Sequence, residues 1–333
     1  MELNEEQLNN LIEEFGIEVV NSERNYWLIR AGKEGVFFED FLFGSFTGIG
    51  YGLNNIENIN DLKKEEIKEK IEQFYPNVSQ SGHIAAKIFN FFHSIKKGDV
   101  IVMPAAGRKS VAFGIVKEDN IYFDKSLPME QSMLFIEDED YDIPNKRRKV
   151  SWKKTVNSKF LQSKLILNLF SPHGLSQLTD PDVIKLIDIN MNDVFIKEDT
   201  GFLTFQINHE KSIDLKTLTN FMGVLEELAS QIDGTPLSVQ MNLNSPGKLT
   251  VYGTKIAVVS LVVFAGIITV FGGHFKSKDG NEISSEGAMG FVKEYFKHKE
   301  NLEETKIKYL DAINKLDIDE AEKIKLIRET MAK

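Results

Sequence analysis

The sequence contains one long stretch without any charged residue, and this stretch restricts the folds that are open to the chain. It runs from Ile256 to Gly273. As a helix, at 1.5 Å per residue, it would be about 27 Å long, close to the thickness of the hydrocarbon core of a bilayer. Strands rarely reach such a length, so the stretch predicts a helix. We expect this helix to span a membrane over residues 256–275. The alternative is a helix that is buried in the core of the protein or of an oligomer.

Mostly small side chains recur at every fourth position of this predicted helix. Small residues at this spacing let membrane helices approach closely and associate. The pattern therefore predicts a homo-oligomer, although a biased composition would give the same spacing. Lysines flank the segment in nearly equal numbers on both sides, so flanking charge does not set its orientation. The predicted oligomer face consists of Ala257, Leu261, Ala265, Thr269 and Gly273.

The rest of the chain alternates between helix and strand patterns, which is typical of an α+β fold. The pattern predicts strands at residues 26–29, 100–103, 111–116 and 121–123, and helices at 60–74 and 81–94. We expect five parts along the chain: an N-terminal helix (1–20), a recognition domain (21–188), a small strand–helix–strand coupling unit (190–253), the apolar helix (256–275) and a charged helical tail (276–333).

Charge and residue usage exclude several classes of protein. The net charge of -10 excludes a chain that is polybasic throughout, but a local basic patch remains open. The chain has no cysteine, which rules out disulfides, thiolate metal sites and cysteine nucleophiles. Its six histidines are scattered, without a pair at three- or four-residue spacing. We therefore expect no metal centre and no cofactor.

Aromatic and basic residues in the first half of the chain suit a nucleic-acid or nucleotide ligand. An extruded base needs stacking partners and hydrogen-bond donors, and phosphates need cations. The chain has only two tryptophans, and one of them follows a basic run at residues 146–149. The alternative is that both tryptophans are core residues on strands. The candidate ligand-binding residues are Trp27, Arg30, Tyr51, Arg108, Lys146, Arg147, Arg148 and Trp152.

A series of short motifs occurs in a fixed order over the same region. These are Tyr26–Gly32, Gly48–Gly52, Asp61-Leu62, Phe74–Pro76, Ile95–Pro104, Ala112–Val116 and Arg148–Trp152. The series, over residues 24–188, resembles the N-terminal module found ahead of Mrr-type nuclease domains. That module often carries a tryptophan where Tyr51 stands here. The resemblance implies a PUA-like β-barrel with helices, and the related EVE and YTH folds read a modified base in an aromatic pocket.

The chain departs from this family where the nuclease domain would follow. Such a nuclease needs carboxylates and a Gln-x-Lys on a strand to hold Mg²⁺ and activate water. No such set follows Asn190, and the string Gln162-Ser163-Lys164 lies inside the recognition domain. We therefore expect a protein that is not an enzyme. The alternative is an enzyme with an unfamiliar active site in residues 190–253.

Together these features predict a sensor–effector protein of prokaryotic antiviral defence. In this hypothesis the PUA-like domain senses a nucleic acid or nucleotide, and the apolar helix acts on the membrane by oligomerising. The protein would lie in the inner (cytoplasmic) membrane as a single-pass protein with its N-terminal domain in the cytoplasm. The alternative is a cytoplasmic specificity protein that binds modified DNA and whose apolar helix is buried in an oligomer. The defence role rests on the resemblance alone.

Overall fold

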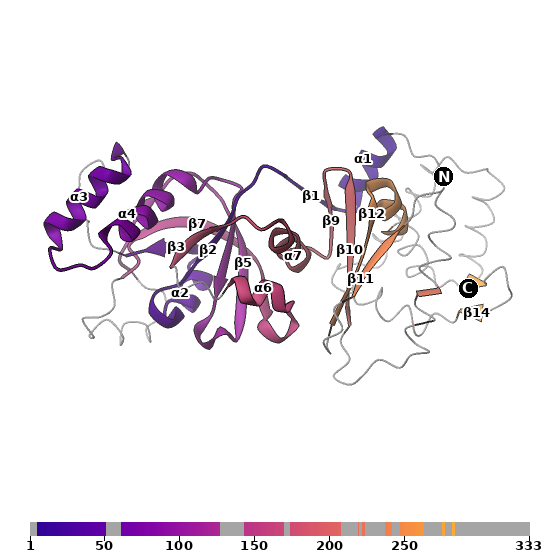
Figure 1. Cartoon of the computed structure of the whole chain (residues 1–333). Helices are drawn as coiled ribbons and strands as arrows, with labels where there is room; N and C mark the ends of the chain where they lie inside the picture. The colour runs from indigo at the N-terminus through magenta and orange to yellow at the C-terminus, as the bar shows by residue number, and fades with distance from the viewer. Residues whose placement is uncertain are drawn as a thin grey trace. The chain divides into compact units, whose positions relative to one another are not determined.

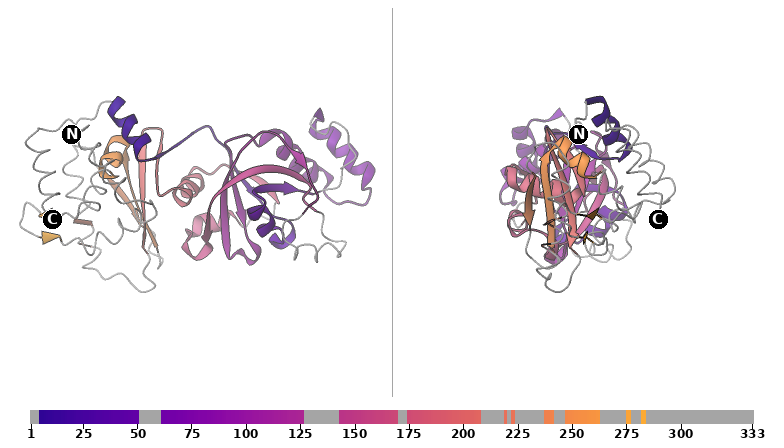
Figure 2. Two further views of the ribbon diagram at one scale, coloured as in Figure 1. Left: turned by 180° about the vertical axis from the view of Figure 1, so that it is seen from behind. Right: turned by 90° about the vertical axis from the view of Figure 1, so that its right-hand side faces the viewer.

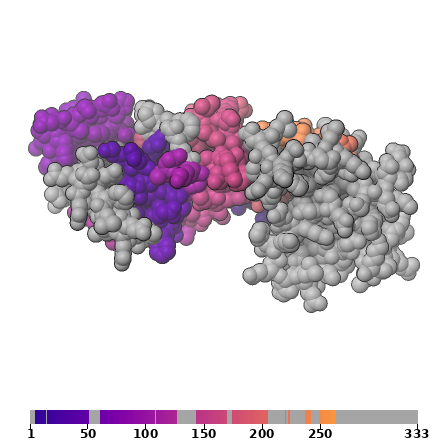
Figure 3. Space-filling model, turned by 90° about the horizontal axis from the view of Figure 1, so that it is seen from below, coloured from indigo at the N-terminus to yellow at the C-terminus, as the bar shows by residue number. Residues whose placement is uncertain are grey.

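The computed structural model divides the chain into two compact units (Figure 1). The inserted unit is Glu23–Met191, and the terminal unit combines Met1–Ser22 with Asn192–Lys333. In Figure 3 the described residues of the inserted unit run from indigo to pink. The sequence did not predict that the N-terminal segment belongs with the C-terminal strands. The structure describes residues 5–50, 61–126, 143–169, 174–207, 219, 222–223, 237–241, 247–262, 275–276 and 282–283.

The inserted unit is built on a curled sheet of seven strands, which confirms a mixed α+β fold (Figures 1 and 2). Its order is β3-β7-β5-β4-β2-β8, with β6 paired to β7. All neighbours are antiparallel except β2 and β4. The long strand β7 pairs with β3 through its first residues and with β5 through the rest, so the sheet turns along it. The strands are β2 (Tyr26–Ile29), β3 (Phe46–Ile49), β4 (Val100–Pro104), β5 (Ser110–Val116), β6 (Tyr122–Phe123), β7 (Lys146–Asn157) and β8 (Leu175–Leu178).

Helices cover both faces of this sheet. Side chains alternate between the two faces of a strand, so Trp27 and Ile29 of β2 face one way and Tyr26 and Leu28 the other. The Trp27 face packs against α3 and α4, and the Tyr26 face packs against α6 and α7. A third cluster of buried residues lies between α2 and the sheet. The helices are α2 (Phe38–Phe43), α3 (Lys64–Phe74), α4 (Ser81–Phe89), the π-helical turn η3 (Asn90–Ser94), α6 (Ser163–Asn168) and α7 (Pro181–Met191).

Gly114 of β5 occupies a position where a side chain has no room. A Cβ at this residue would lie 2.5 Å from Cγ1 of Val150 and 2.7 Å from Cε3 of Trp152. We expect Gly114→Ala to lower the free energy of unfolding by about 1–3 kcal/mol, because neighbouring side chains must leave their packed positions. Urea denaturation measures this change. The control is Gly82→Ala on α4, where a Cβ meets nothing within 4 Å. Equal stability of parent and Gly114→Ala would contradict this packing.

The terminal unit contains a sheet of five strands in the order β1-β9-β10-β12-β11. Strand β1 is parallel to β9, and the remaining neighbours are antiparallel. Most of the helix predicted within residues 190–253 lies outside the described residues. Of the tail predicted to be helical, the described residues Lys276 and 282–283 lie in strands instead. The elements are α1 (Glu5–Glu14), β1 (Glu18–Val20), β9 (Val194–Lys197), β10 (Thr200–Ile207), β11 (Ser238–Met241), β12 (Gly247–Thr254), β13 (Phe275–Lys276) and β14 (Glu282–Ile283).

The predicted membrane helix is described only at its two ends. Residues 255–262 are helical, and 263–274 lie outside the described residues. No helix in the described part of the chain is long and apolar enough to cross a bilayer. All six residues at positions 257–262 are buried, and Val258 packs on β10, where a Cβ added to Gly201 would lie 2.6 Å from the Cβ of Val258. The start of the apolar segment therefore belongs to the core of the terminal unit. Of the predicted oligomer face, Ala257 and Leu261 are buried there, and Ala265, Thr269 and Gly273 lie outside the described residues.

Candidate functional site

The basic run at the start of β7 is buried. The side chains of Lys146, Arg147 and Arg148 are 0 %, 2 % and 1 % exposed. A buried cation is unfavourable unless it finds acceptors within the protein. The surroundings of each side chain therefore show what the run does in the folded unit.

Arg148 binds the carbonyl groups at the end of the α4–η3 helix. Its Nε donates to the Phe91 oxygen at 2.9 Å, its Nη2 to the Phe92 oxygen at 3.0 Å, and its Nη1 to the Asp119 oxygen at 2.7 Å. The last carbonyls of a helix lack partners within the helix and carry partial negative charge, so a cation is stabilising there. Burial lowers the pKa of Arg148 to about 10, which still leaves it protonated at neutral pH.

Arg147 and Lys146 hold the chain segments beside β7. The Nε of Arg147 donates to the Pro144 oxygen at 2.9 Å, and its Nη1 lies 3.0 Å from Oδ2 of Asp124. Its guanidinium also lies 4.1 Å from the centre of the Phe46 ring. The Nζ of Lys146 donates to the Gly50 oxygen at 2.8 Å. The sequence predicted exposed phosphate contacts for this run, and the structure instead places all three cations in the interior.

The two tryptophans are also held by bonds within the protein. Trp27 is 2 % exposed, and its Nε1 donates to Oδ2 of Asp99 at 2.9 Å. Asp99 also accepts the backbone N–H groups of Asn25 and Lys96. Trp152 is partly buried, and its Nε1 donates to the Phe41 oxygen at 2.8 Å. These contacts agree with the alternative that the sequence left open, namely core aromatics on strands.

The predicted ligand pocket is not assembled by the described residues. Trp27 pairs with Ile101, Ile101 with Gly114, and Gly114 with Trp152, so the four residues form one row across the sheet. Strands β4 and β5 therefore lie between the two tryptophans, whose backbones are about 14 Å apart. Arg30 follows β2 on the opposite side, where its Nη2 approaches the Leu169 oxygen at 3.4 Å. Tyr51 lies outside the described residues. Trp27 and Arg30 therefore do not face one ligand.

Trp27→Phe tests whether this indole is structural. The variant removes the N–H that Asp99 accepts and part of a packed ring system. We expect the free energy of unfolding to fall by about 1–3 kcal/mol, because the carboxylate of Asp99 loses one of its donors and the core loses part of a packed ring. Thermal denaturation measures the loss. A Trp27→Phe variant that is as stable as the parent would contradict a structural role for this indole.

Exposed lysines gather instead on three neighbouring loops at one end of the sheet, which we call the basic loops. They are η1 (Lys33–Gly35), η4 with the residue after it (Ala106–Lys109) and η5 (Ser158–Phe160). η1 meets η4 so closely that a Cβ on Gly35 would lie 2.8 Å from the Ala106 nitrogen. Ser158 donates its N–H to the Lys109 oxygen at 3.0 Å, which brings η5 beside them.

The basic loops carry the exposed cations Lys33, Lys109 and Lys159. Arg108 also lies on η4, but its side chain is outside the description. The backbone has positive φ at Gly35 (78°) and Gly107 (59°), which other residues rarely adopt. The sequence pattern selected Arg108 on η4 as a candidate ligand-binding residue but did not select Lys33 or Lys159, although the spacing Gly32-Lys33-Glu34-Gly35 marks a turn.

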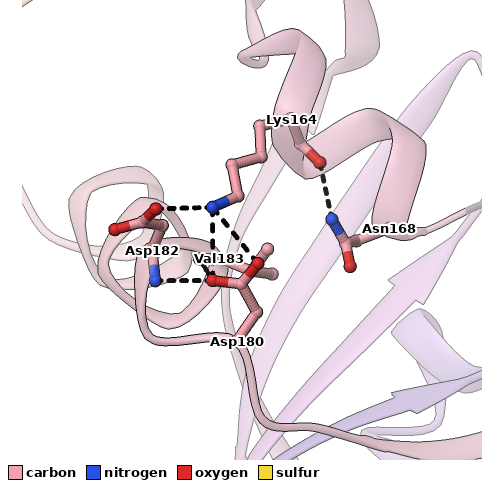
Figure 4. Close-up of polar contacts among 5 residues, drawn as sticks. All are labelled: Lys164, Asn168, Asp180, Asp182 and Val183. Atoms are coloured by element: carbon pink, nitrogen blue, oxygen red, sulfur yellow. Dashed lines mark hydrogen bonds and ion pairs between the residues drawn. The ribbon is translucent and has the colours of Figure 1, made fainter.

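Within the Gln162-Ser163-Lys164 string, Lys164 links two helices at the surface (Figure 4). The Nζ of Lys164 on α6 lies 3.1 Å from Asp180 and 2.5 Å from Asp182 at the start of α7. Hydrogen bonding to Lys164 lowers the pKa of Asp180. The lysine lies on a helix and not on a strand, unlike the nuclease arrangement. Within the described ranges, no group of three or more His, Asp or Glu side chains is placed to hold a metal ion.

Comparison with known proteins adds one match. No curated protein and no solved structure matches the chain. Residues 27–170, which extend from β2 past the end of α6 and include all three basic loops, match the family described as "Domain of unknown function (DUF8426)".

Proposed function

We propose that the inserted unit recognises nucleic acid and that the basic loops contact its phosphates. The neighbouring positions of the three loops, which carry the exposed residues Lys33, Lys109 and Lys159, support this proposal. Lysine ammonium groups bind phosphate as point charges, and such contacts provide most of the sequence-independent affinity for nucleic acid.

The distribution of charge between the units supports the same surface. The inserted unit has 23 Lys and Arg against 23 Asp and Glu, so its formal charge is zero. The terminal unit has 17 against 27 and therefore carries the whole net charge of -10. The acidic terminal unit therefore repels a polyanion. The inserted unit is neutral overall, and its basic loops provide a local positive charge that can attract one.

The packing of the apolar segment favours the second of the two functional hypotheses. Residues 257–262 are buried, with Val258 on β10, as expected for a helix in a protein core. We therefore propose a recognition protein related in role to the specificity components of restriction-like defence. The membrane effector is the competing hypothesis.

Fluorescence anisotropy with a labelled 20-base-pair DNA duplex, and with single-stranded RNA of the same length, tests the proposal. We expect Lys33→Ala/Lys109→Ala to weaken binding more than tenfold at low salt, because two phosphate contacts are lost. The control is Lys164→Ala, which removes a lysine already paired with two carboxylates on α7. A parent protein that binds neither probe, or a double variant that binds like the parent, would refute phosphate recognition by these loops.

A further inference from the structure

The inserted unit is the connection between two parallel strands of the terminal unit. Strand β1 pairs with β9 in parallel, with Glu18 opposite Phe195 and Val20 opposite Lys197. Parallel neighbours cannot be joined by a hairpin and need a crossover of a dozen or more residues. Here the crossover is the whole of Glu23–Met191. The pairing of β1 with β9 therefore depends on how far apart the inserted unit holds its own two ends.

Three buried side chains tie these ends together, and we call them the clamp. The Nη2 of Arg24 lies 2.6 Å from Oδ1 of Asp188, and the hydroxyl of Tyr26 donates to the same oxygen at 2.6 Å. The Nε of Arg24 also donates to the Tyr26 oxygen at 2.8 Å. Asp188, on α7, is 0 % exposed. Burial, together with the charge of Asp188, raises the pKa of Tyr26, so its hydroxyl keeps the proton that it donates.

The clamp lies next to both chain connections. Arg24 is four residues after the end of β1, and Asp188 is six residues before the start of β9. With the clamp closed, about ten residues join the two strands, and residues 189–191 among them still belong to α7, whereas about 170 residues would join the strands if the inserted unit were unfolded. The closure entropy of a flexible loop grows with the logarithm of its length, so this shortening favours the β1–β9 pair by roughly 70-fold.

We infer that the clamp couples the two units through the chain itself: its closure holds β1 against β9, and its opening releases β1 from the sheet of the terminal unit. Coupling of this kind is reciprocal. A change that loosens the ends of the inserted unit must therefore appear in β1 and β9, even though neither strand belongs to that unit. The inference is independent of the ligand that the basic loops bind.

Hydrogen–deuterium exchange of the full chain, followed by mass spectrometry of peptides, tests the coupling. Tyr26→Phe removes one hydroxyl and keeps the ring, and Asp188→Asn removes the charge that Arg24 faces. We expect exchange in β1 and β9 to rise severalfold in Tyr26→Phe and tens of fold in Asp188→Asn, because exchange reports local opening. Strands β4 and β5 should keep their protection. The control is Lys164→Met, which breaks the ion pairs between α6 and α7 and leaves the clamp intact.

Unchanged exchange in β1 and β9 in both clamp variants would overturn the inference. The same holds if Lys164→Met and Asp188→Asn raise their exchange equally, because the effect would then be general destabilisation. If Asp188→Asn unfolds the whole inserted unit, β1 and β9 must lose protection together with β4 and β5. Protection of β1 and β9 that survives such unfolding contradicts the coupling just as directly.

Discussion

Replacing Arg148 with Met is expected to lower the free energy of unfolding by about 3–5 kcal/mol, because two buried carbonyl groups and a third, partly buried one lose their donor. Two of these groups, on Phe91 and Phe92, are at the end of the α4–η3 helix, and the third, on Asp119, precedes β6. Methionine fills a similar length but donates no hydrogen bond. Urea denaturation of the full chain, followed by fluorescence, measures the loss.

Lys149→Met is the matched control for this variant. Lys149 is the next residue on β7, its side chain is 58 % exposed, and it pairs with Glu118 at 3.1 Å on the surface. Exposed pairs contribute about 0–1 kcal/mol, so the control should unfold almost like the parent. If Arg148→Met proves as stable as Lys149→Met but loses nucleic-acid binding, the buried basic run is a ligand site after all.

Replacing Val258 with Asp is expected to destabilise the terminal unit by about 4 kcal/mol or more, because the carboxylate would be buried without a partner. Val258 is 0 % exposed and packs on Gly201 of β10. Hydrogen exchange should therefore increase in β10 and β12, while the strands of the inserted unit stay protected. Ser260→Ala is the control, because the buried Oγ of Ser260 has no hydrogen-bond partner among the described residues. This control should be neutral or slightly stabilising.

The same pair of variants separates the two hypotheses for the apolar segment. If the segment is a core helix, Val258→Asp changes stability and exchange. If it spans a membrane instead, Val258→Asp leaves the sheet protected and abolishes association with membranes in a sedimentation assay, because a charge in a span costs about 2.5–3.5 kcal/mol. A variant that keeps protection in β10 and loses membrane association would contradict the packing of residues 257–262 as a core helix.

Local patterns in the sequence predicted much of the inserted unit. The strand at residues 26–29 is β2, the strand at 100–103 is most of β4, and the helix at 60–74 contains α3. These elements have strong apolar periodicity or a clear stop at Pro76. The pairing of β1 with β9 was not predictable in this way, because the two strands are separated by the entire inserted unit.

Charge patterns were less informative than apolar patterns. Lys146, Arg147 and Arg148 look like an exposed face in the sequence, yet they begin a twelve-residue strand and point at carbonyl groups from distant segments. A run of cations can be buried only when the fold brings hydrogen-bond acceptors to it. These acceptors come from segments that are distant in the sequence, so the run alone does not predict its burial. The proposed phosphate surface therefore lies on the loops that carry the exposed Lys33 and Lys109, and not on this buried run.

The salt dependence of DNA binding tests the central claim most directly. The logarithm of the affinity falls with the logarithm of the salt concentration by about 0.9 for each phosphate that a cation neutralises. Lys33→Ala/Lys109→Ala should therefore reduce this slope by about 2 relative to the parent. Lys164→Ala should leave the slope unchanged. Equal slopes for the parent and the double variant would contradict the claim that the basic loops contact the phosphates.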